Sequence, residues 1–246
     1  MDENTQQFLL KLNQDFYEGY ASSFSSTRYS IQPGIRQLLP ALLSSHKVLD
    51  LGCGNGNLAK ALLDAGFEDL YVGLDNSQGL LNEAQDSIAG TEKGQFGFVQ
   101  ADLASDWSGS ISCGNFDTVV SFALLHHLPL EIVQNNFFNT IEGLLLSGGH
   151  FYLSTWQVKN NQRLQSRIQD WSTVGLDPAL LSEDDLLLDW RAEPDLPPHY
   201  RYVRHYDSTL LRQLGESAGL KLEKEFFSDG KEGNLALYQV WKKFEL

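Results

Sequence analysis

Short apolar runs alternate with amphipathic stretches through the middle of the chain. Mostly apolar residues fill positions 48–51, 70–74, 96–99, 116–122 and 150–156, and each run has the length of a buried strand. Between these runs, apolar residues recur every three or four positions, as on the buried face of a helix. Strands that alternate with helices in this way predict a parallel sheet that carries helices on both faces.

Two further helices are expected before the first strand. Apolar side chains fall at helical spacing between residues 5 and 24, and the simplest interpretation is a helix whose apolar stripe faces the core. Pro33 stands where a second helix can begin, and apolar residues continue at helical spacing to residue 43. We therefore expect a helical cap over residues 1–45.

The chain beyond the fifth strand is less regular. Residues 160–171 predict another helix, whereas residues 177–198 hold seven acids, four prolines and one arginine, which is typical of a solvated insertion. Asp207 can cap a helix that ends near residue 217. Two alternating stretches, 222–227 and 235–242, then predict a pair of antiparallel strands.

The pattern as a whole predicts the α/β class. We expect a Rossmann-like sheet of seven mostly parallel strands with an antiparallel last strand, within one domain over residues 1–246. The helical cap and an acidic insertion over residues 172–200, which follows strand five, are additions to that domain.

Composition and charge narrow the classes of function. The net charge of −14 weighs against non-specific binding of a polyanion, although it leaves room for a local basic patch or a basic partner. No apolar run reaches the roughly 18 residues that span a bilayer, and the acidic N-terminus lacks the features of a signal peptide. Cys53 and Cys113 form no Cys-x-x-Cys pair, so we expect no metal site and a reduced, cytoplasmic setting.

A glycine-rich turn follows the first strand. Asp50 precedes Gly52, Gly54 and Gly56, and an amphipathic helix comes next. Glycines at such a turn let the backbone approach a nucleotide-like ligand closely. A dinucleotide fingerprint has the spacing Gly-x-Gly-x-x-Gly, which differs from the spacing here. The turn instead resembles motif I of class I S-adenosylmethionine (SAM) methyltransferases, whose acid, here Asp50, usually serves the methionine end of the cofactor.

Three other positions complete the predicted cofactor site. Cys53 lies inside the turn, where a small space-filling side chain is expected and a nucleophile is the alternative. Asp75, with Asn76 beside it, ends the second strand, where an acid can accept hydrogen bonds from both ribose hydroxyls. Asp102 and Leu103 follow the third strand, and the same resemblance implies that Asp102 contacts the adenine amino group.

Four side chains are candidates for the methyl acceptor. His126 and His127 follow the fourth strand, where an imidazole can orient the acceptor or take a proton, or can simply pack under the next helix. Arg28 follows the first helix, and Arg201 begins a basic and aromatic cluster over residues 201–206. A guanidinium can bind a carboxylate or phosphate, whereas a solvated surface charge is the alternative.

Beyond this class, the chain resembles the eukaryotic-type tRNA methyltransferases that esterify 5-carboxymethyluridine at the wobble position. The matching pieces are Tyr17 with residues 24–28, residues 50–56, 75–78 and 123–127, Trp156, Arg201 with Tyr202 and Tyr206, and Gly233 with Asn234. One departure is Ser147, which stands where that family usually has proline.

The resemblance implies a SAM-dependent enzyme that methylates an oxygen of tRNA. It also implies a small zinc-binding activator subunit as a partner. The acidic composition fits an alternative, a small-molecule O- or N-methyltransferase. A second alternative is a non-catalytic SAM-binding module, in which Arg28 and the histidine pair would be dispensable.

Overall fold

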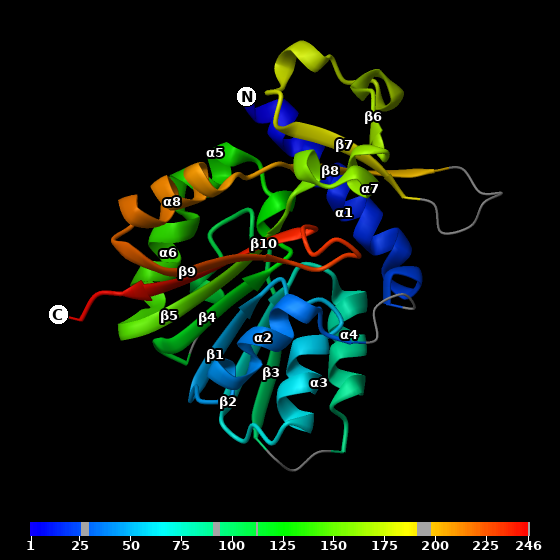
Figure 1. The fold of residues 1–246 in the computed structure, drawn as a ribbon. Helices are drawn as coiled ribbons and strands as arrows, with labels where there is room; N and C mark the ends of the chain where they lie inside the picture. Colours follow the sequence, from blue (N-terminus) through cyan, green and yellow to red (C-terminus); the bar gives the residue numbers. More distant parts are fainter. Residues whose placement is uncertain (26–29, 91–93, 112, 191–197, 246) are drawn as a thin grey trace.

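A seven-stranded sheet forms the centre of the computed structural model, which describes residues 1–25, 30–90, 94–111, 113–190 and 198–245 (Figure 1). In spatial order its strands are β3 (Gln95–Gln100), β2 (Leu70–Asp75), β1 (Lys47–Leu51), β4 (Phe116–Phe122), β5 (Leu145–Trp156), β10 (Ala236–Lys243) and β9 (Leu220–Ser228). β10 runs antiparallel to both β5 and β9, and the other neighbouring pairs are parallel. The predicted α/β class, with an antiparallel last strand, is confirmed.

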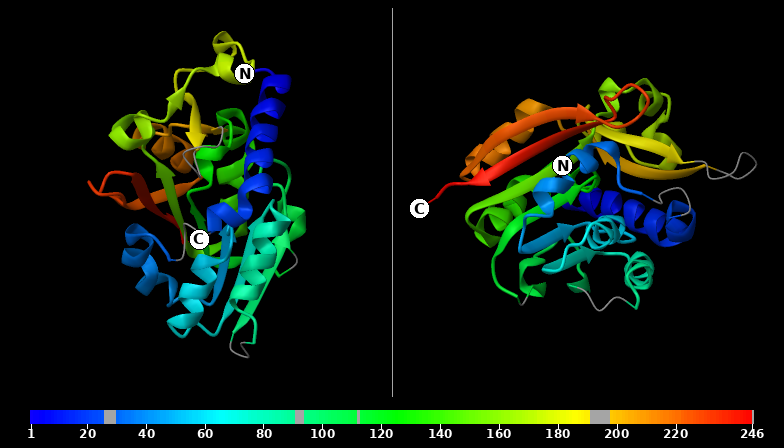
Figure 2. Two further views of the ribbon diagram at one scale, coloured as in Figure 1. Left: turned by 90° about the vertical axis from the view of Figure 1, so that its right-hand side faces the viewer. Right: turned by 60° about the horizontal axis from the view of Figure 1, so that its bottom comes forward.

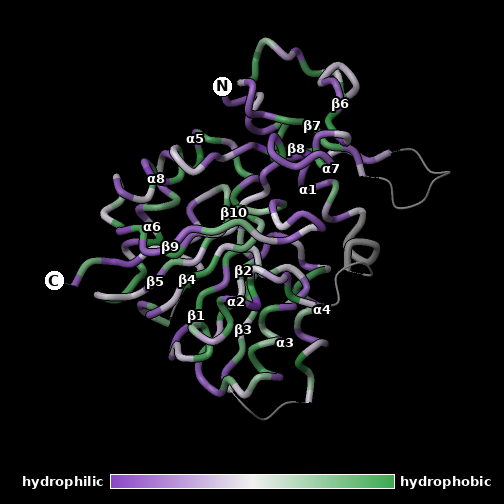
Figure 3. Tube along the Cα trace, viewed as in Figure 1, coloured by the Kyte–Doolittle hydropathy of each residue, from purple (hydrophilic) through white to green (hydrophobic). Residues whose placement is uncertain are grey.

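Helices cover both faces of this sheet (Figures 1 and 2). One face carries α2 (Pro33–Leu42), α3 (Asn57–Asp64) and α4 (Gln78–Ser87); the other carries α5 (Leu130–Ile132), α6 (Phe138–Leu144) and α8 (Ser208–Ser217). Successive strand residues alternate between the faces: Val48 packs with α2 and α3, and Leu49 packs in the core that α6 and α8 cover. The centre of the sheet is accordingly its most apolar part (Figure 3).

The winding of the sheet reverses next to β1. The chain leads from β1 outward through β2 to β3, then returns to β4 on the other side of β1 and continues to β5. Ligands of open α/β sheets bind at the carboxyl ends of the strands at such a reversal, because the loops leave a crevice there. The glycine turn, Asp75 and the histidine pair all follow strands that end at this crevice.

A second, three-stranded antiparallel sheet lies above that edge. It consists of β6 (Ile168–Gln169), β7 (Asp185–Trp190) and β8 (His199–Arg204), and the long helix α1 (Glu3–Ser25) runs beside it (Figure 1). Leu9 of α1 packs with Trp171, Leu187 and Tyr202 in a small core of its own. The first helix and the insertion therefore form one structural unit over the crevice.

The prediction of one continuous helix over residues 160–171 is wrong. Only α7 (Gln162–Gln165) is α-helical there, and short 3-10 turns surround it. The Asn161 side chain accepts a hydrogen bond from Leu164 N, and the Asp170 side chain accepts one from Ser172 N. Each polar side chain starts a new local turn, so no continuous helix forms.

The prediction that residues 177–198 form an irregular, solvated segment is wrong in part. β7 occupies residues 185–190, and its acids are paired rather than solvated: Asp185 accepts from the Tyr202 hydroxyl at 2.7 Å and from Arg204 Nη1 at 2.9 Å. Ser182 is a local partner of Asp185, but Tyr202 and Arg204 lie 17 and 19 residues from it, and such pairing is invisible to pattern analysis. None of the described helices is long and apolar enough to cross a membrane.

Candidate functional site

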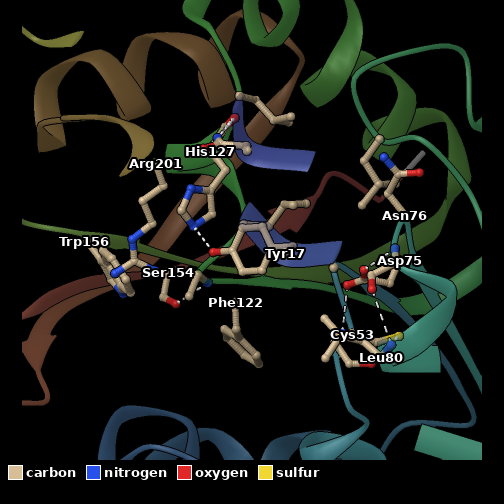
Figure 4. Close-up of a pocket in the computed structure, with 18 of the residues that line it drawn as sticks. Tyr17, Cys53, Asp75, Asn76, Leu80, Phe122, His127, Ser154, Trp156 and Arg201 are labelled. Carbon is tan, nitrogen blue, oxygen red and sulfur yellow. Dashed lines mark hydrogen bonds between the residues drawn. The ribbon is translucent and has the colours of Figure 1, made fainter. Parts of the chain in front are cut away.

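A cavity of about 840 Å³ opens at the carboxyl edge of the large sheet, beneath α1 and the small sheet (Figure 4). Of the predicted site residues it is lined by Asp50, Gly52, Cys53, Gly54, Asp75, Asn76, Asp102, Leu103, His127 and Arg201. Gly56 and His126 do not line it, and Arg28 lies outside the described residues. In Figure 4, Asp75 and Arg201 lie toward opposite ends of the cavity with Tyr17 between them.

The glycines of the turn share a backbone conformation, and two of them also differ in what surrounds them. Gly52, Gly54 and Gly56 all have positive φ, between 55° and 76°, which disfavours any larger side chain. A Cβ on Gly54 would meet only open space, on the cavity side, whereas a Cβ on Gly56 would lie 2.8 Å from Ala84 Cβ of α4. Gly54 therefore keeps the ligand space open, and Gly56 lets the turn pack against α4.

The Asp75 carboxylate is held by the backbone of two turns. Its Oδ2 accepts from Gly54 N and its Oδ1 accepts from Ser77 N, each at 2.9 Å. Burial raises the pKa of this carboxyl, and the backbone N–H donors oppose that effect. Each carboxylate oxygen keeps a further lone pair, so Asp75 has the capacity to bind a pair of ligand hydroxyls.

Asp50 lies deeper, at the end of β1. It is buried and accepts a short hydrogen bond of 2.5 Å from the hydroxyl of Tyr71 on β2. Burial raises its pKa to about 7, against the opposing effect of the Tyr71 hydrogen bond. A ligand ammonium group at this end of the cavity would stabilise the ionised form.

The loop after β3 lines the same cavity as the glycine turn. Asp102 is exposed, with Oδ1 accepting from Ala104 N at 3.0 Å, and Leu103 is buried beside it. Asn76 is exposed, and its carbonyl accepts from the Gln100 side chain at 2.9 Å. An apolar wall next to carboxylate and carbonyl acceptors suits a purine with an exocyclic amino group.

Arg201, on β8, lies in an aromatic box. Its Cζ is 4.5 Å from the ring centroid of Trp156, 5.2 Å from that of Phe16 and 5.6 Å from that of Trp190. Its side chain is buried, and within the described part of the chain its Nε and Nη1 have no hydrogen-bond partner. Burial lowers the pKa of this guanidinium. A buried cation with two nitrogens that lack hydrogen-bond partners is an anion-binding arrangement.

The two histidines have different surroundings. His126 is fully buried, stacks on Trp156 at a centroid distance of 4.5 Å, and accepts from Trp156 N at Nδ1. His127 lines the cavity, with Nε2 2.6 Å from the Tyr17 hydroxyl and Nδ1 3.1 Å from the Tyr202 carbonyl oxygen. His126 therefore supports the box from behind, and His127 faces the ligand space.

Sequence reasoning missed several residues of this site. Trp190 lies in the segment that the sequence predicts to be a solvated insertion. Asn13 and Phe16 lie in the helix whose apolar stripe the sequence predicts to face the core. Asn13 is a sequence signal for this site, because an amide side chain within an apolar stripe is buried with the stripe and must find hydrogen-bond partners there. In the described part of the chain, no three His, Cys, Asp or Glu side chains gather as a set of metal ligands.

Comparisons with known proteins identify the family. The model of the methyltransferase domain family matches residues 24–225. The tRNA (carboxymethyluridine(34)-5-O)-methyltransferase ALKBH8 of Mus musculus is 31% identical over 150 residues, which cover 61% of this chain and 20% of the mouse protein. The chain thus spans only about a fifth of that relative.

Two further matches extend the comparison. The trans-aconitate 2-methyltransferase of Acidovorax sp. strain JS42 is 40% identical over 65 residues, 26% of this chain and 23% of that protein. The magnesium protoporphyrin IX methyltransferase of Synechocystis PCC 6803, solved with bound S-adenosylhomocysteine (SAH), superposes with a TM-score of 0.62 at 18% identity. That superposition covers 94% of this chain and 97% of the solved one.

Proposed function

Because the chain belongs to the methyltransferase domain family and is a SAM-dependent methyltransferase, we propose that it transfers the methyl group of SAM to a carboxylate oxygen. The favoured acceptor is the carboxymethyl group of a tRNA wobble uridine. The observation that supports this proposal is the buried Arg201 guanidinium. Two of its nitrogens have no hydrogen-bond partner in the described part of the chain, and the residue lines the same cavity as the glycine turn.

The residues around the glycine turn fit the cofactor. Asp75 offers both carboxylate oxygens to a ribose diol, Asp50 offers a buried carboxyl to the methionine ammonium group, and Leu103 offers an apolar wall to adenine. SAM supplies a sulfonium-activated methyl group for SN2 displacement. The protein's contribution is therefore to hold the acceptor oxygen in line with that group.

The acceptor end of the cavity suits a carboxylate nucleophile. A carboxylate is already ionised at neutral pH, so it needs a cation to orient it rather than a base to deprotonate it. The aromatic box around Arg201 excludes water, which strengthens the attraction between guanidinium and carboxylate. Its Trp and Phe rings also offer flat surfaces on which a nucleobase can stack.

The relatives support a carboxylate acceptor more strongly than they support tRNA. The mouse relative is named for carboxymethyluridine and the Acidovorax relative for trans-aconitate, and both of these compounds carry carboxylates. The net charge of −14 favours the second candidate function, methylation of a small carboxylate.

Two measurements on matched variants test the proposal. Calorimetry with SAH should show tight binding to the wild type and binding about 100-fold weaker to Asp75→Ala, since two charged hydrogen bonds are lost. Arg201→Ala should bind SAH normally yet lose methyl transfer, whereas Arg212→Ala, which removes an exposed arginine of α8, should keep both activities.

The acceptor is identified with SAM labelled on its methyl group. The protein is incubated separately with unmethylated bulk tRNA and with a pool of small carboxylic acids. Base-labile label in tRNA would indicate an ester on the wobble uridine. Label in the acid pool alone would favour the small-molecule function, and SAH binding without any transfer would favour the non-catalytic module.

A further inference from the structure

Three buried nitrogens in the aromatic box have no hydrogen-bond partner within the described part of the chain. They are Nε and Nη1 of Arg201 on β8 and the indole Nε1 of Trp190 on β7. Arg201 and Trp190 both line the cavity. Part of the Trp190 side chain is exposed, but its nitrogen is buried. Two neighbouring side chains of the cavity wall therefore hold donors that lack acceptors.

The pairing of β7 with β8 brings these two side chains together. Leu188 lies directly opposite Arg201, and Trp190 follows Leu188 by two residues, so the three side chains share one face of the small sheet. The ring centroid of Trp190 is 5.6 Å from Arg201 Cζ. A ligand group that contacts the guanidinium therefore lies close to the indole as well.

An unpartnered buried N–H group is unfavourable, because it has given up a hydrogen bond to water without a replacement. Other side chains of the same small sheet avoid this cost. The indole nitrogen of Trp171 donates to the carbonyl oxygen of Asp185 at 3.3 Å. Arg204 leaves its Nε without a partner but donates from Nη1 to Asp185 at 2.9 Å. Trp190 differs from both, because Nε1 is the only polar atom of its side chain.

The surroundings of the three nitrogens favour an anion as the missing partner. The rings of Phe16, Trp156 and Trp190 lie 4.5–5.6 Å from the guanidinium carbon, and they offer it no oxygen acceptor. Asp189, the acid that precedes Trp190, lies 3.3 Å from Arg167, so its charge is paired there. A buried cation beside a neutral N–H donor suits an oxyanion, which supplies both the opposite charge and several acceptor lone pairs.

We infer that Trp190 is a second acceptor-binding residue, whose indole N–H donates to an oxygen of the same anionic group that the Arg201 guanidinium binds. The carboxylate identity of that group rests on the proposed function. The unpartnered nitrogens and their proximity do not depend on it. An indole adds a directional donor without adding a second positive charge beside the buried Arg201, so it selects for an oxygen at a particular place.

The contact between Trp190 and Phe16 is the competing use of the indole N–H. The two rings lie edge to face, with centroids 6.4 Å apart and an interplanar angle of 89°. An N–H group that points at a ring face makes a weak hydrogen bond. The two uses differ in NMR, because ring current shifts such a proton upfield, whereas an oxyanion acceptor shifts it downfield.

The indole ¹H–¹⁵N resonances of the full chain with bound SAH test the inference. The chain has five tryptophans, and Trp190→Phe assigns the resonance of interest by its loss. The probes are a tRNA anticodon stem-loop that carries 5-carboxymethyluridine, trans-aconitate, and inorganic phosphate, each added separately. The stem-loop should shift the Trp190 indole proton downfield and leave that of Trp171 in place.

The other outcomes of this titration are distinct. A Trp190 resonance that none of the three probes shifts downfield would overturn the inference. A downfield shift with trans-aconitate or phosphate, but none with the stem-loop, would uphold the oxyanion site and reject the wobble uridine as the acceptor.

A matched pair of tryptophan variants provides the second test. Trp190→Phe keeps a ring beside Arg201 and removes the N–H group. In calorimetry it should bind the anion that shifts the resonance about tenfold more weakly, with the Kd for SAH and the thermal stability little changed. Trp171→Phe removes a bonded indole N–H outside the cavity, so it should lower the stability and leave anion binding unchanged. Unchanged anion binding by Trp190→Phe would contradict the inference.

Discussion

Asp50 shows how burial changes the chemistry of a single residue. Sequence alone identifies it as the acid of a cofactor turn, but the structure places it beneath Tyr71, where its pKa rises to about 7. The unfolded chain has the ordinary value of 3.8. The contribution of Asp50 to stability is therefore fully present below about pH 4 and is lost as the pH rises through about 7.

The affinity for SAH should depend on the ionisation of Asp50 as well, but it should increase with pH where the stability decreases. A ligand ammonium group favours ionised Asp50, so the affinity for SAH should rise about tenfold between pH 6 and pH 8. Calorimetry at several pH values measures this change. Asp50→Asn, which keeps an acceptor for Tyr71 but no charge, should bind more weakly and with a flat pH profile. A wild-type profile that is equally flat would show that Asp50 does not serve the ammonium group.

The sequence leaves open whether Cys53 fills space in the glycine turn or acts as a nucleophile. The structure places its Sγ where a Cβ on Gly73 would approach to 2.8 Å, so the thiol fills space against β2. Burial also raises the pKa of this thiol well above its ordinary value, which disfavours the nucleophilic thiolate. The space-filling interpretation is therefore the better supported of the two.

At the scale of elements, the docking of α1 on β8 decides the shape of the acceptor end. The hydrophobic stripe of α1 was expected to face the core, but the sequence does not reveal which core. Leu9 packs against the small sheet, and Asn13 pairs with the backbone of β8. The helix thereby lines the cavity, brings Phe16 to Arg201 and places Tyr17 beside His127.

Asn13→Ala should destabilise the protein by about 2–3 kcal/mol, because it removes the acceptor of the buried Tyr202 N–H and a donor to the carbonyls of His127 and Tyr202. Chemical denaturation measures this change. The neighbouring Gln14→Ala is the control, since Gln14 is exposed and its side chain donates to the exposed Glu18 one turn further along α1; its effect should stay within about 0.5 kcal/mol. Equal stability of the two variants would contradict the bracing role of Asn13.

The two elements that sequence analysis described wrongly share a physical cause. Residues 160–171 contain polar side chains that cap local turns, and β7 pairs its acids with Tyr202 and Arg204. In each case a hydrogen bond to a particular partner outweighs the local pattern. Periodicity detects repeated burial, and it carries no information about single polar contacts.

At the scale of the whole molecule, the net charge of −14 opposes the approach of tRNA. Arg163 and Arg167, on and beside α7, line the same cavity as Arg201, although Arg167 lies 3.3 Å from Asp189. These arginines place positive charge at the cavity although the chain as a whole is acidic. A small zinc-binding activator subunit, which the family resemblance implies, stays a prediction, and additional basic surface is what such a subunit would have to contribute.

The salt dependence of methyl transfer should separate the two acceptor classes. With even two phosphate contacts, transfer to tRNA at low substrate concentration should fall about tenfold between 50 and 200 mM salt, because counterion release weakens. Transfer to a small carboxylate should fall much less. Initial rates at several salt concentrations measure this, and salt-independent transfer to tRNA would argue against phosphate contacts.

The sequence by itself determined the large sheet and its glycine turn, and it predicted many of the residues that line the cavity beside that turn. Those features are local: a strand, three glycines and an acid lie within a few residues of one another, and hydrophobic periodicity marks the strands that follow. Asp75 and Asp102 were predicted in the same way, because each lies at the carboxyl end of a strand that the sheet order brings to one edge.

Only the tertiary structure decided how the acceptor end is built. Tyr17, His127, Trp156 and Arg201 come from four separate elements, and no spacing in the sequence indicates that they meet. Their arrangement depends on hydrogen bonds between side chains and distant backbone groups, such as those of Asn13 with β8. Such contacts follow from how α1 and the small sheet pack over the cavity, which the pattern of apolar residues leaves open.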